Sequence, residues 1–116
     1  MIVNDRMKQY VVDEIRAPEY ERIKTYLDTE FGSPEMGGIY WITIPEELMS
    51  EVQHAHKACQ PYCFALDLLP ERLSCELLVR TRNRIRCDCM GYATESQRDW
   101  IISVVDAMFE RLEIYT

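Results

Sequence analysis

Proline divides this chain into short segments, and this division limits each helix or strand to a modest length. A proline inside a helix removes a backbone N–H and clashes with the preceding turn, whereas at the first helical position it is well tolerated. The five prolines therefore mark where elements begin, end or turn: Pro18, Pro34, Pro45, Pro61 and Pro70. No repeat or linker separates these segments, so we expect one domain over residues 1–116.

The first two elements are predicted to be a strand and a helix. Residues 8–16 are rich in β-favouring side chains and predict a strand. Pro18 then stands where a first helical residue would, and Gly32 fits a left-handed cap at the other end. Between them an apolar stripe follows the helical spacing: Tyr20, Ile23, Leu27 and Phe31.

The next two elements are again predicted to be a strand and a helix. Residues 39–44 are aromatic and β-branched on both faces, which is typical of a central strand. Pro45 is expected to begin a second helix that Pro61 ends. Its shared face would carry Leu48, Val52, Ala55, His56 and Cys59.

Residues 62–90 predict a three-strand meander. The strands are expected over residues 62–69, 73–81 and 84–90. Residues 70–72 and 82–83 are expected to form the turns between them. Asparagine at position 83 suits the second turn because it tolerates the left-handed conformation of tight hairpins.

The last element is predicted to be a helix that begins at a capping box, Thr94 to Gln97. Its inward stripe is Trp100, Ile101, Val104, Val105, Met108 and Leu112. Ile102 and Phe109 lie off that stripe. A helix that is apolar on more than one side is either deeply buried or meets a partner.

The resulting order is β-α-β-α-β-β-β-α. We therefore expect an α+β fold with a mixed or antiparallel sheet of about five strands, including the C-terminal meander, and helices packed on one face.

The charge balance excludes some classes of partner. The formal net charge is −7 at pH 7, and such an acidic surface repels nucleic acid and anionic lipid. No run of residues reaches the length of a membrane span, and the N-terminus does not resemble a signal peptide. We therefore expect a cytoplasmic protein that binds neither membranes nor nucleic acid.

A cluster of histidine and cysteine is the first candidate site. His54, His56, Cys59 and Cys63 fall within one short segment. Imidazole and thiolate are preferred ligands of zinc, and thiolates also bind iron–sulfur clusters. His56, Cys59 and Cys63 could thus form a zinc or iron site, completed by His54, Cys87 or Cys89. The spacing matches no standard zinc motif, and packing of these side chains in the core is the favoured explanation.

Two cysteines on the third meander strand, Cys87 and Cys89, are expected to point to one face because residues two apart on a strand do so. That face is expected to be the core face, shared with Cys75, Leu77 and Val79 on the neighbouring strand. We therefore predict that these thiols pack as small apolar groups.

An arginine-rich hairpin is the second candidate site. Arg80, Arg82, Arg84 and Arg86 concentrate positive charge on an otherwise acidic chain. Guanidinium groups bind phosphate and carboxylate in a bidentate manner, which suggests an anion or an acidic partner. The alternative is a solvated hairpin whose charges pair with nearby carboxylates and prevent edge-to-edge association.

No catalytic motif is present: the chain lacks a nucleophile elbow, a phosphate-binding glycine loop and a dinucleotide fingerprint. We therefore expect a non-catalytic binding or regulatory domain that acts through protein–protein contacts and forms homo-oligomers. Its interface would include Ile102 and Phe109. A zinc or iron protein and an anion-binding module are the alternatives.

Overall fold

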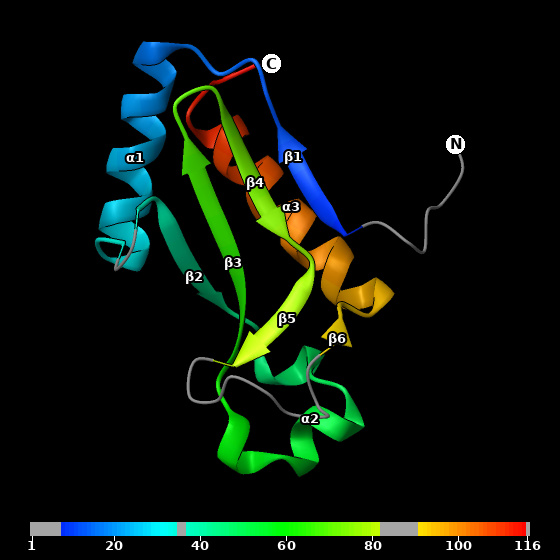
Figure 1. Cartoon of the computed structure of the whole chain (residues 1–116). Helices are drawn as coiled ribbons and strands as arrows, with labels where there is room; N and C mark the ends of the chain where they lie inside the picture. The colour runs from blue at the N-terminus through cyan, green and yellow to red at the C-terminus, as the bar shows by residue number, and fades with distance from the viewer. Residues whose placement is uncertain (1–7, 35–36, 82–90, 116) are drawn as a thin grey trace.

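The computed structural model describes residues 8–34, 37–81 and 91–115 (Figure 1). Three α-helices and six strands lie in these ranges. In chain order the elements are β1 (Gln9–Val12), α1 (Ala17–Phe31), β2 (Ile39–Thr43), α2 (Glu51–Ala55), β3 (Tyr62–Leu69), β4 (Arg72–Glu76), β5 (Leu78–Thr81), β6 (Gly91–Tyr92) and α3 (Glu95–Arg111). Two short 3-10 helices, Glu46–Leu48 and Lys57–Cys59, flank α2.

The strands form one antiparallel sheet in which β3 is central. The order is β1-β4-β3-β5-β6, and β2 pairs with the opposite side of β3. β4 and β5 follow each other along the same side of β3, since Leu69 pairs with Arg72 and Tyr62 pairs with Thr81. The predicted α+β fold with an antiparallel sheet is thus confirmed, with one strand more than expected.

The prediction that residues 39–44 form a central strand is wrong. Among the described strands, β2 pairs with β3 alone and so lies at an edge. Tyr40 and Ile42 are buried against the helices, whereas Ile39 and Trp41 alternate onto the other face and are partly exposed. The apolar side chains on both faces reflect an open sheet face rather than a second buried layer.

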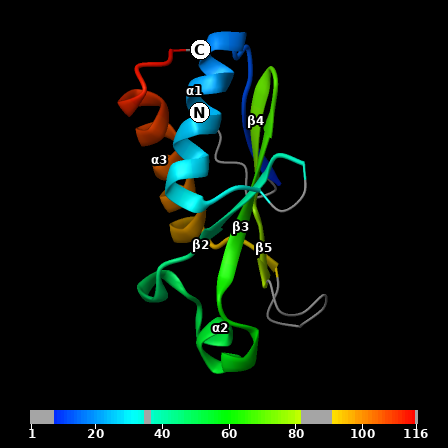
Figure 2. The ribbon, with the colours of Figure 1, turned by 90° about the vertical axis from the view of Figure 1, so that its left-hand side faces the viewer.

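The helices α1 and α3 cover one face of the sheet, as expected (Figure 2). The core lies between the two layers. Its largest fully buried apolar side chains are Tyr62, Phe64, Ile23, Leu27, Leu66, Leu73, Leu77 and Ile101. Cys75 on β4, Leu77 between the strands and Val79 on β5 all face the core. The prediction that these three residues share a core face is thus confirmed.

The first strand is shorter than the predicted residues 8–16. β1 ends at Val12, and Glu14 has a positive φ of 59°, a left-handed conformation that turns the chain out of the strand. Ile15 then reaches the core, and its backbone N–H donates to the carbonyl of Glu71.

The helix predicted from Pro18 to Gly32 is confirmed. Gly32 has a positive φ of 80°, although its ψ of 165° differs from that of a left-handed cap. At the beginning, the Glu19 carboxylate accepts from the Arg16 backbone N–H and from the Arg16 guanidinium. Phe31 is an exception to the predicted apolar stripe, because it lies in the last turn and is 39% exposed.

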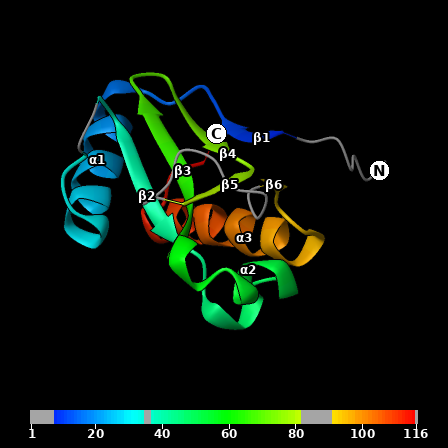
Figure 3. The same ribbon diagram turned by 60° about the horizontal axis from the view of Figure 1, so that its bottom comes forward.

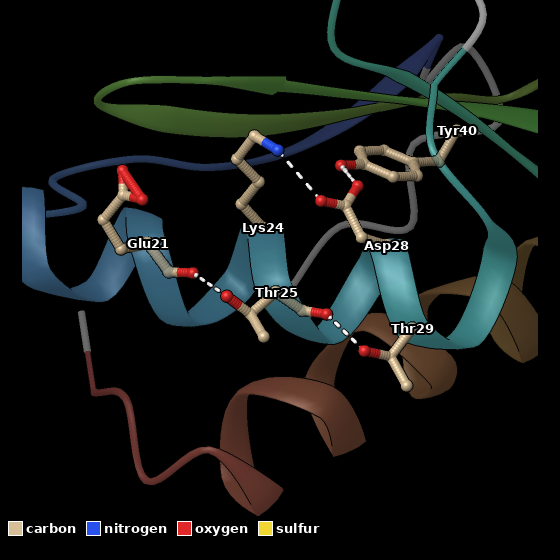
Figure 4. Close-up of polar contacts among 6 residues, drawn as sticks. All are labelled: Glu21, Lys24, Thr25, Asp28, Thr29 and Tyr40. Atoms are coloured by element: carbon tan, nitrogen blue, oxygen red, sulfur yellow. Dashed lines mark hydrogen bonds and ion pairs between the residues drawn. The ribbon is translucent and has the colours of Figure 1, made fainter.

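Polar contacts join α1 to β2 (Figure 4). The Tyr40 hydroxyl donates to Asp28 at 2.6 Å, and the Lys24 ammonium lies 2.9 Å from the other oxygen of that carboxylate. These contacts hold the pKa of Asp28 below its usual value, chiefly through the hydrogen bond from Tyr40. At the start of β2, Gly38 lies so close to Leu68 that a β-carbon would clash with its carbonyl.

The second helix is much shorter than predicted. Residues 46–59 form two 3-10 turns around the five-residue α2 instead of one continuous helix. The Ser50 hydroxyl accepts from the Gln53 N–H and so begins a new helix. The shared apolar face is consequently lost, and Val52 is 52% exposed.

The last helix begins as predicted. The Thr94 hydroxyl accepts from the Gln97 N–H, and the Gln97 side chain accepts from the Thr94 N–H. The Gln97 amide is fully buried and donates at 2.8 Å to both the Leu48 carbonyl and the Gln53 side chain. This contact places α2 beside the N-terminal end of α3 (Figure 3).

The third predicted meander strand, residues 84–90, lies outside the described residues. β6 follows it and pairs with β5 through Leu78 and Val79. None of the helices in the described ranges is both long and apolar enough to span a bilayer.

Candidate binding surface on the open face of the sheet

The face of the sheet opposite α1 and α3 is the broadest candidate binding surface; we call it the open face. None of the described helices covers it (Figure 2). Side chains alternate across a strand, so buried and partly exposed positions alternate along much of the sheet. β5 shows this most clearly, because Val79 and Thr81 are buried while Leu78 and Arg80 are partly exposed.

A shallow cavity of about 470 Å³ lies on the open face. This volume is within the range of small-ligand sites, roughly 300–1,000 Å³. Apolar side chains from four strands, β2, β3, β5 and β6, contribute to its lining: Ile39, Ala65, Leu78 and Tyr92. Charged side chains are interspersed among them: Lys8, Asp67, Glu76 and Arg80. The open face is therefore mixed in character, with aromatic and aliphatic groups between charges of both signs.

Side-chain contacts order the polar part of this cavity. The Arg80 Nε lies 2.6 Å from the Glu76 carboxylate, and the Arg80 Nη2 lies 3.5 Å from its other oxygen. The hydrogen bond to Glu76 is the main reason that the pKa of Arg80 is raised. Next to this pair, the Ser74 hydroxyl donates to the Gln9 amide oxygen at 2.9 Å. Both residues of the ion pair are 40% exposed, so the pair orients its groups more than it stabilises the fold.

The His/Cys cluster is not assembled into a metal site in the described residues. Cys59 and Cys63 are buried, and His56 ends α2 with partial exposure. No three His, Cys, Asp or Glu side chains of residues 8–34, 37–81 and 91–115 gather closely enough to hold a metal ion. His54 is exposed on α2, and the other expected ligands, Cys87 and Cys89, lie outside these ranges. The structural explanation of Cys59 and Cys63 as packing groups agrees with their burial.

The thiol of Cys75 is poorly suited to nucleophilic chemistry. Burial, and to a smaller extent the nearby Glu76 charge, raise its pKa to about 12. The thiolate is the reactive form of cysteine, so at neutral pH this side chain remains a neutral packing group.

Only part of the arginine hairpin lies in the described chain. Arg80 is on β5 and points onto the open face, where it pairs with Glu76 as the structural alternative expected. Arg82, Arg84 and Arg86 lie outside the described residues.

The two residues expected at an interface on α3 differ in exposure. Phe109 is 7% exposed and belongs to the core, so most of its surface is covered within the chain. Its burial follows from the chain after α3, which returns to the core with Ile114, a residue that is 3% exposed. Ile102 is partly exposed and lies one turn before Asp106 on the same row of the helix.

The open-face residues Ile39, Leu78 and Tyr92 were missed as candidates in the sequence. Their signal is the alternation of buried and exposed positions, which emerges once the strand register is known. Comparisons with protein-family models, curated protein sequences and solved structures give no match for this chain. The described residues thus define a two-layer α+β sandwich with one open sheet face.

Proposed function

We propose that this protein is a non-catalytic binding domain that self-associates through the open face of its sheet. The single observation that carries the proposal is the lack of a covering layer on this face among the described elements, together with its exposed aromatic and aliphatic side chains. Aromatic residues are enriched at protein interfaces, and Tyr92 is 55% exposed there.

The charge distribution favours a second copy as the partner. The chain carries a net charge of −7, so two copies repel each other over most of their surfaces. At the cavity on the open face this repulsion is reduced, because Lys8 and Arg80 balance Asp67 and Glu76. Two copies can therefore approach through this face with little repulsion.

A symmetric arrangement uses these charges well. In a two-fold dimer the same patch contacts itself, so the cations of one copy meet the carboxylates of the other. Between the charges, Leu78 and Tyr92 supply apolar area that leaves water when the two sheets meet.

Analytical ultracentrifugation of the full chain over a range of concentrations tests the proposal. We expect a reversible dimer, and Tyr92→Glu should weaken its association by roughly tenfold or more because it places a charge in the contact. Val52→Glu is the matched control, since Val52 is similarly exposed at 52% but lies on α2. A wild-type chain that stays monomeric at high concentration would overturn the proposal, as would equal effects of the two variants.

A further inference from the structure

A second surface lies at the edge of the sheet on the helix side, independent of the open face. β1 is the last strand on its side and pairs with β4 alone among the described strands (Figure 1). α3 lies behind β1, and the chain after α3 returns toward the same edge. We call the space between β1 and α3 the edge groove.

The outer edge of β1 presents backbone groups for another strand. The N–H of Leu77 donates to the carbonyl of Lys8, so this pair exchanges hydrogen bonds across the ladder. Bonded and non-bonded pairs alternate in an antiparallel ladder, so Tyr10 also directs its backbone groups toward β4. Gln9 and Val11 therefore direct theirs outward, and Val11 is 40% exposed. Such an edge is a template for strand addition.

The edge groove has an apolar floor and an exposed aromatic rim. It encloses about 510 Å³, and its floor includes the buried side chains of Phe109 and Ile114. Tyr115 stands at the rim and is 79% exposed. Tyr10 forms the strand side of the groove and donates a hydrogen bond to Asp106 at 2.5 Å.

The charges of the edge groove have one sign. Asp106 and Glu110 lie one helical turn apart and both line it, and none of the described lining residues is a cation. The whole chain is acidic as well, with a net charge of −7. A lysine or arginine side chain suits this combination, because its aliphatic stem covers an apolar floor while its charged end reaches a carboxylate.

We infer that the edge groove binds an extended basic segment of a partner protein, which adds to the sheet as a strand beside β1. Backbone hydrogen bonds to Gln9 and Val11 supply the pairing. Alternate side chains of the added strand point to the helix side. Lysine or arginine at these positions rests on Ile114 and Tyr115 and meets Asp106 and Glu110.

The binding test uses a capped peptide of alternating lysine and threonine, titrated into the full chain and followed by calorimetry. We expect saturable one-to-one binding that weakens as salt is added. A matched peptide with glutamate in place of lysine should not bind, and binding of both peptides alike would overturn the proposal.

Two variants separate the charge and the backbone contributions. Asp106→Asn with Glu110→Gln keeps an acceptor for the Tyr10 hydroxyl but removes both charges, and we expect roughly tenfold weaker binding. Val11→Pro removes an outward N–H and leaves the ladder to β4 intact, because proline is tolerated on the solvent side of an edge strand. We expect it to abolish binding while the circular dichroism spectrum stays native. Native affinity in either variant overturns the inference, and the charge variant remains decisive if Val11→Pro does not fold.

The outcome is distinguishable from that of the self-association proposal. The same titration on Tyr92→Glu should give the wild-type affinity, because Tyr92 lines the open face and Asp106 lines the edge groove. The alternative is that a second copy of the chain occupies the edge groove. In that case the peptide should compete with the second copy and dissociate the wild-type dimer. That result would overturn the inference that a basic partner segment binds there.

Discussion

The phenolic oxygen of Tyr10 lies 2.5 Å from a carboxylate oxygen of Asp106, although 96 positions separate the two residues in the chain. This hydrogen bond ties the edge strand β1 to the middle of α3. Burial, the hydrogen bond and the negative charge of Asp106 together raise the pKa of Tyr10 from 10.0 to about 12.

Asp106→Asn should lower the pKa of Tyr10, though not fully to 10.0, because burial is the largest cause of the shift. The raised pKa means that folding favours the neutral phenol. Its contribution to stability is therefore present below pH 10 and is lost as the pH rises from 10 toward 12. Ultraviolet absorbance titration of the tyrosines measures this, with Tyr10→Phe identifying the signal. Asp99→Asn, an exposed change on the same helix, is the control; identical curves for wild type and Asp106→Asn would contradict the assignment.

Glu19→Gln should make the free energy of unfolding depend less on pH under acidic conditions. Glu19 is nearly buried at the start of α1, and its hydrogen bonds with Arg16 lower its pKa from 4.5 to about 2. A lowered pKa stabilises the fold above pH 4.5, and this contribution disappears as the pH falls from 4.5 toward 2. Urea denaturation at several pH values should show a shallower decline for Glu19→Gln than for wild type. The exposed Glu21→Gln should follow the wild-type decline; a parallel loss in all three proteins would argue against the role of Glu19.

Gln97→Met should destabilise the fold by about 1–3 kcal/mol, because it removes the hydrogen bonds that the buried Gln97 amide donates to the Leu48 carbonyl and the Gln53 side chain. The side chain keeps a similar volume, so the lost polar contacts dominate. Chemical denaturation followed by circular dichroism measures the change. Gln9→Met makes the same substitution at an exposed position and should shift stability by less than about 0.5 kcal/mol. Equal stability of Gln97→Met and wild type would mean that the amide network contributes nothing.

Tyr40→Phe should cost about 1 kcal/mol and raise the pKa of Asp28 toward its ordinary value. The Tyr40 hydroxyl is the main cause that keeps the pKa of Asp28 low, and Lys24 supplies the second hydrogen bond. Nuclear magnetic resonance titration of the Asp28 carboxyl carbon reports the change directly. Lys24→Met should raise the same pKa by less, and a larger effect of Lys24→Met would reverse the order of the two causes.

The elements that were predicted well from the sequence carry their own end signals. Pro18 with Gly32 and Thr94 with Gln97 fix their helices through contacts within a few residues, so local chemistry decides them. The second helix was predicted too long because Ser50 can either continue a helix or cap a new one, and the buried Gln97 amide favours the second choice. That contact joins residues far apart in the chain and leaves no local signal.

The candidate surfaces were harder to predict, because they depend on which strands become neighbours. Phe109 was assigned to an interface from the helical spacing alone, but Ile114 returns to the core beside it. The open face and the edge groove likewise arise from strand order, which periodicity does not encode. Of the two residues that were predicted at an interface, Ile102 is partly exposed and Phe109 is buried.

The attachment of β1 also has a consequence for the motions of the protein. The Ser74 hydroxyl bonds the Gln9 side chain diagonally across the ladder, although the two residues are 65 positions apart, so the pairing of β1 with β4 closes a long loop. A strand held by one neighbour across such a loop joins late during folding and is the first to open in the native state. We therefore expect the amide hydrogens of Tyr10 and Val12 to exchange with solvent sooner than those of β3, whose two sides are both paired.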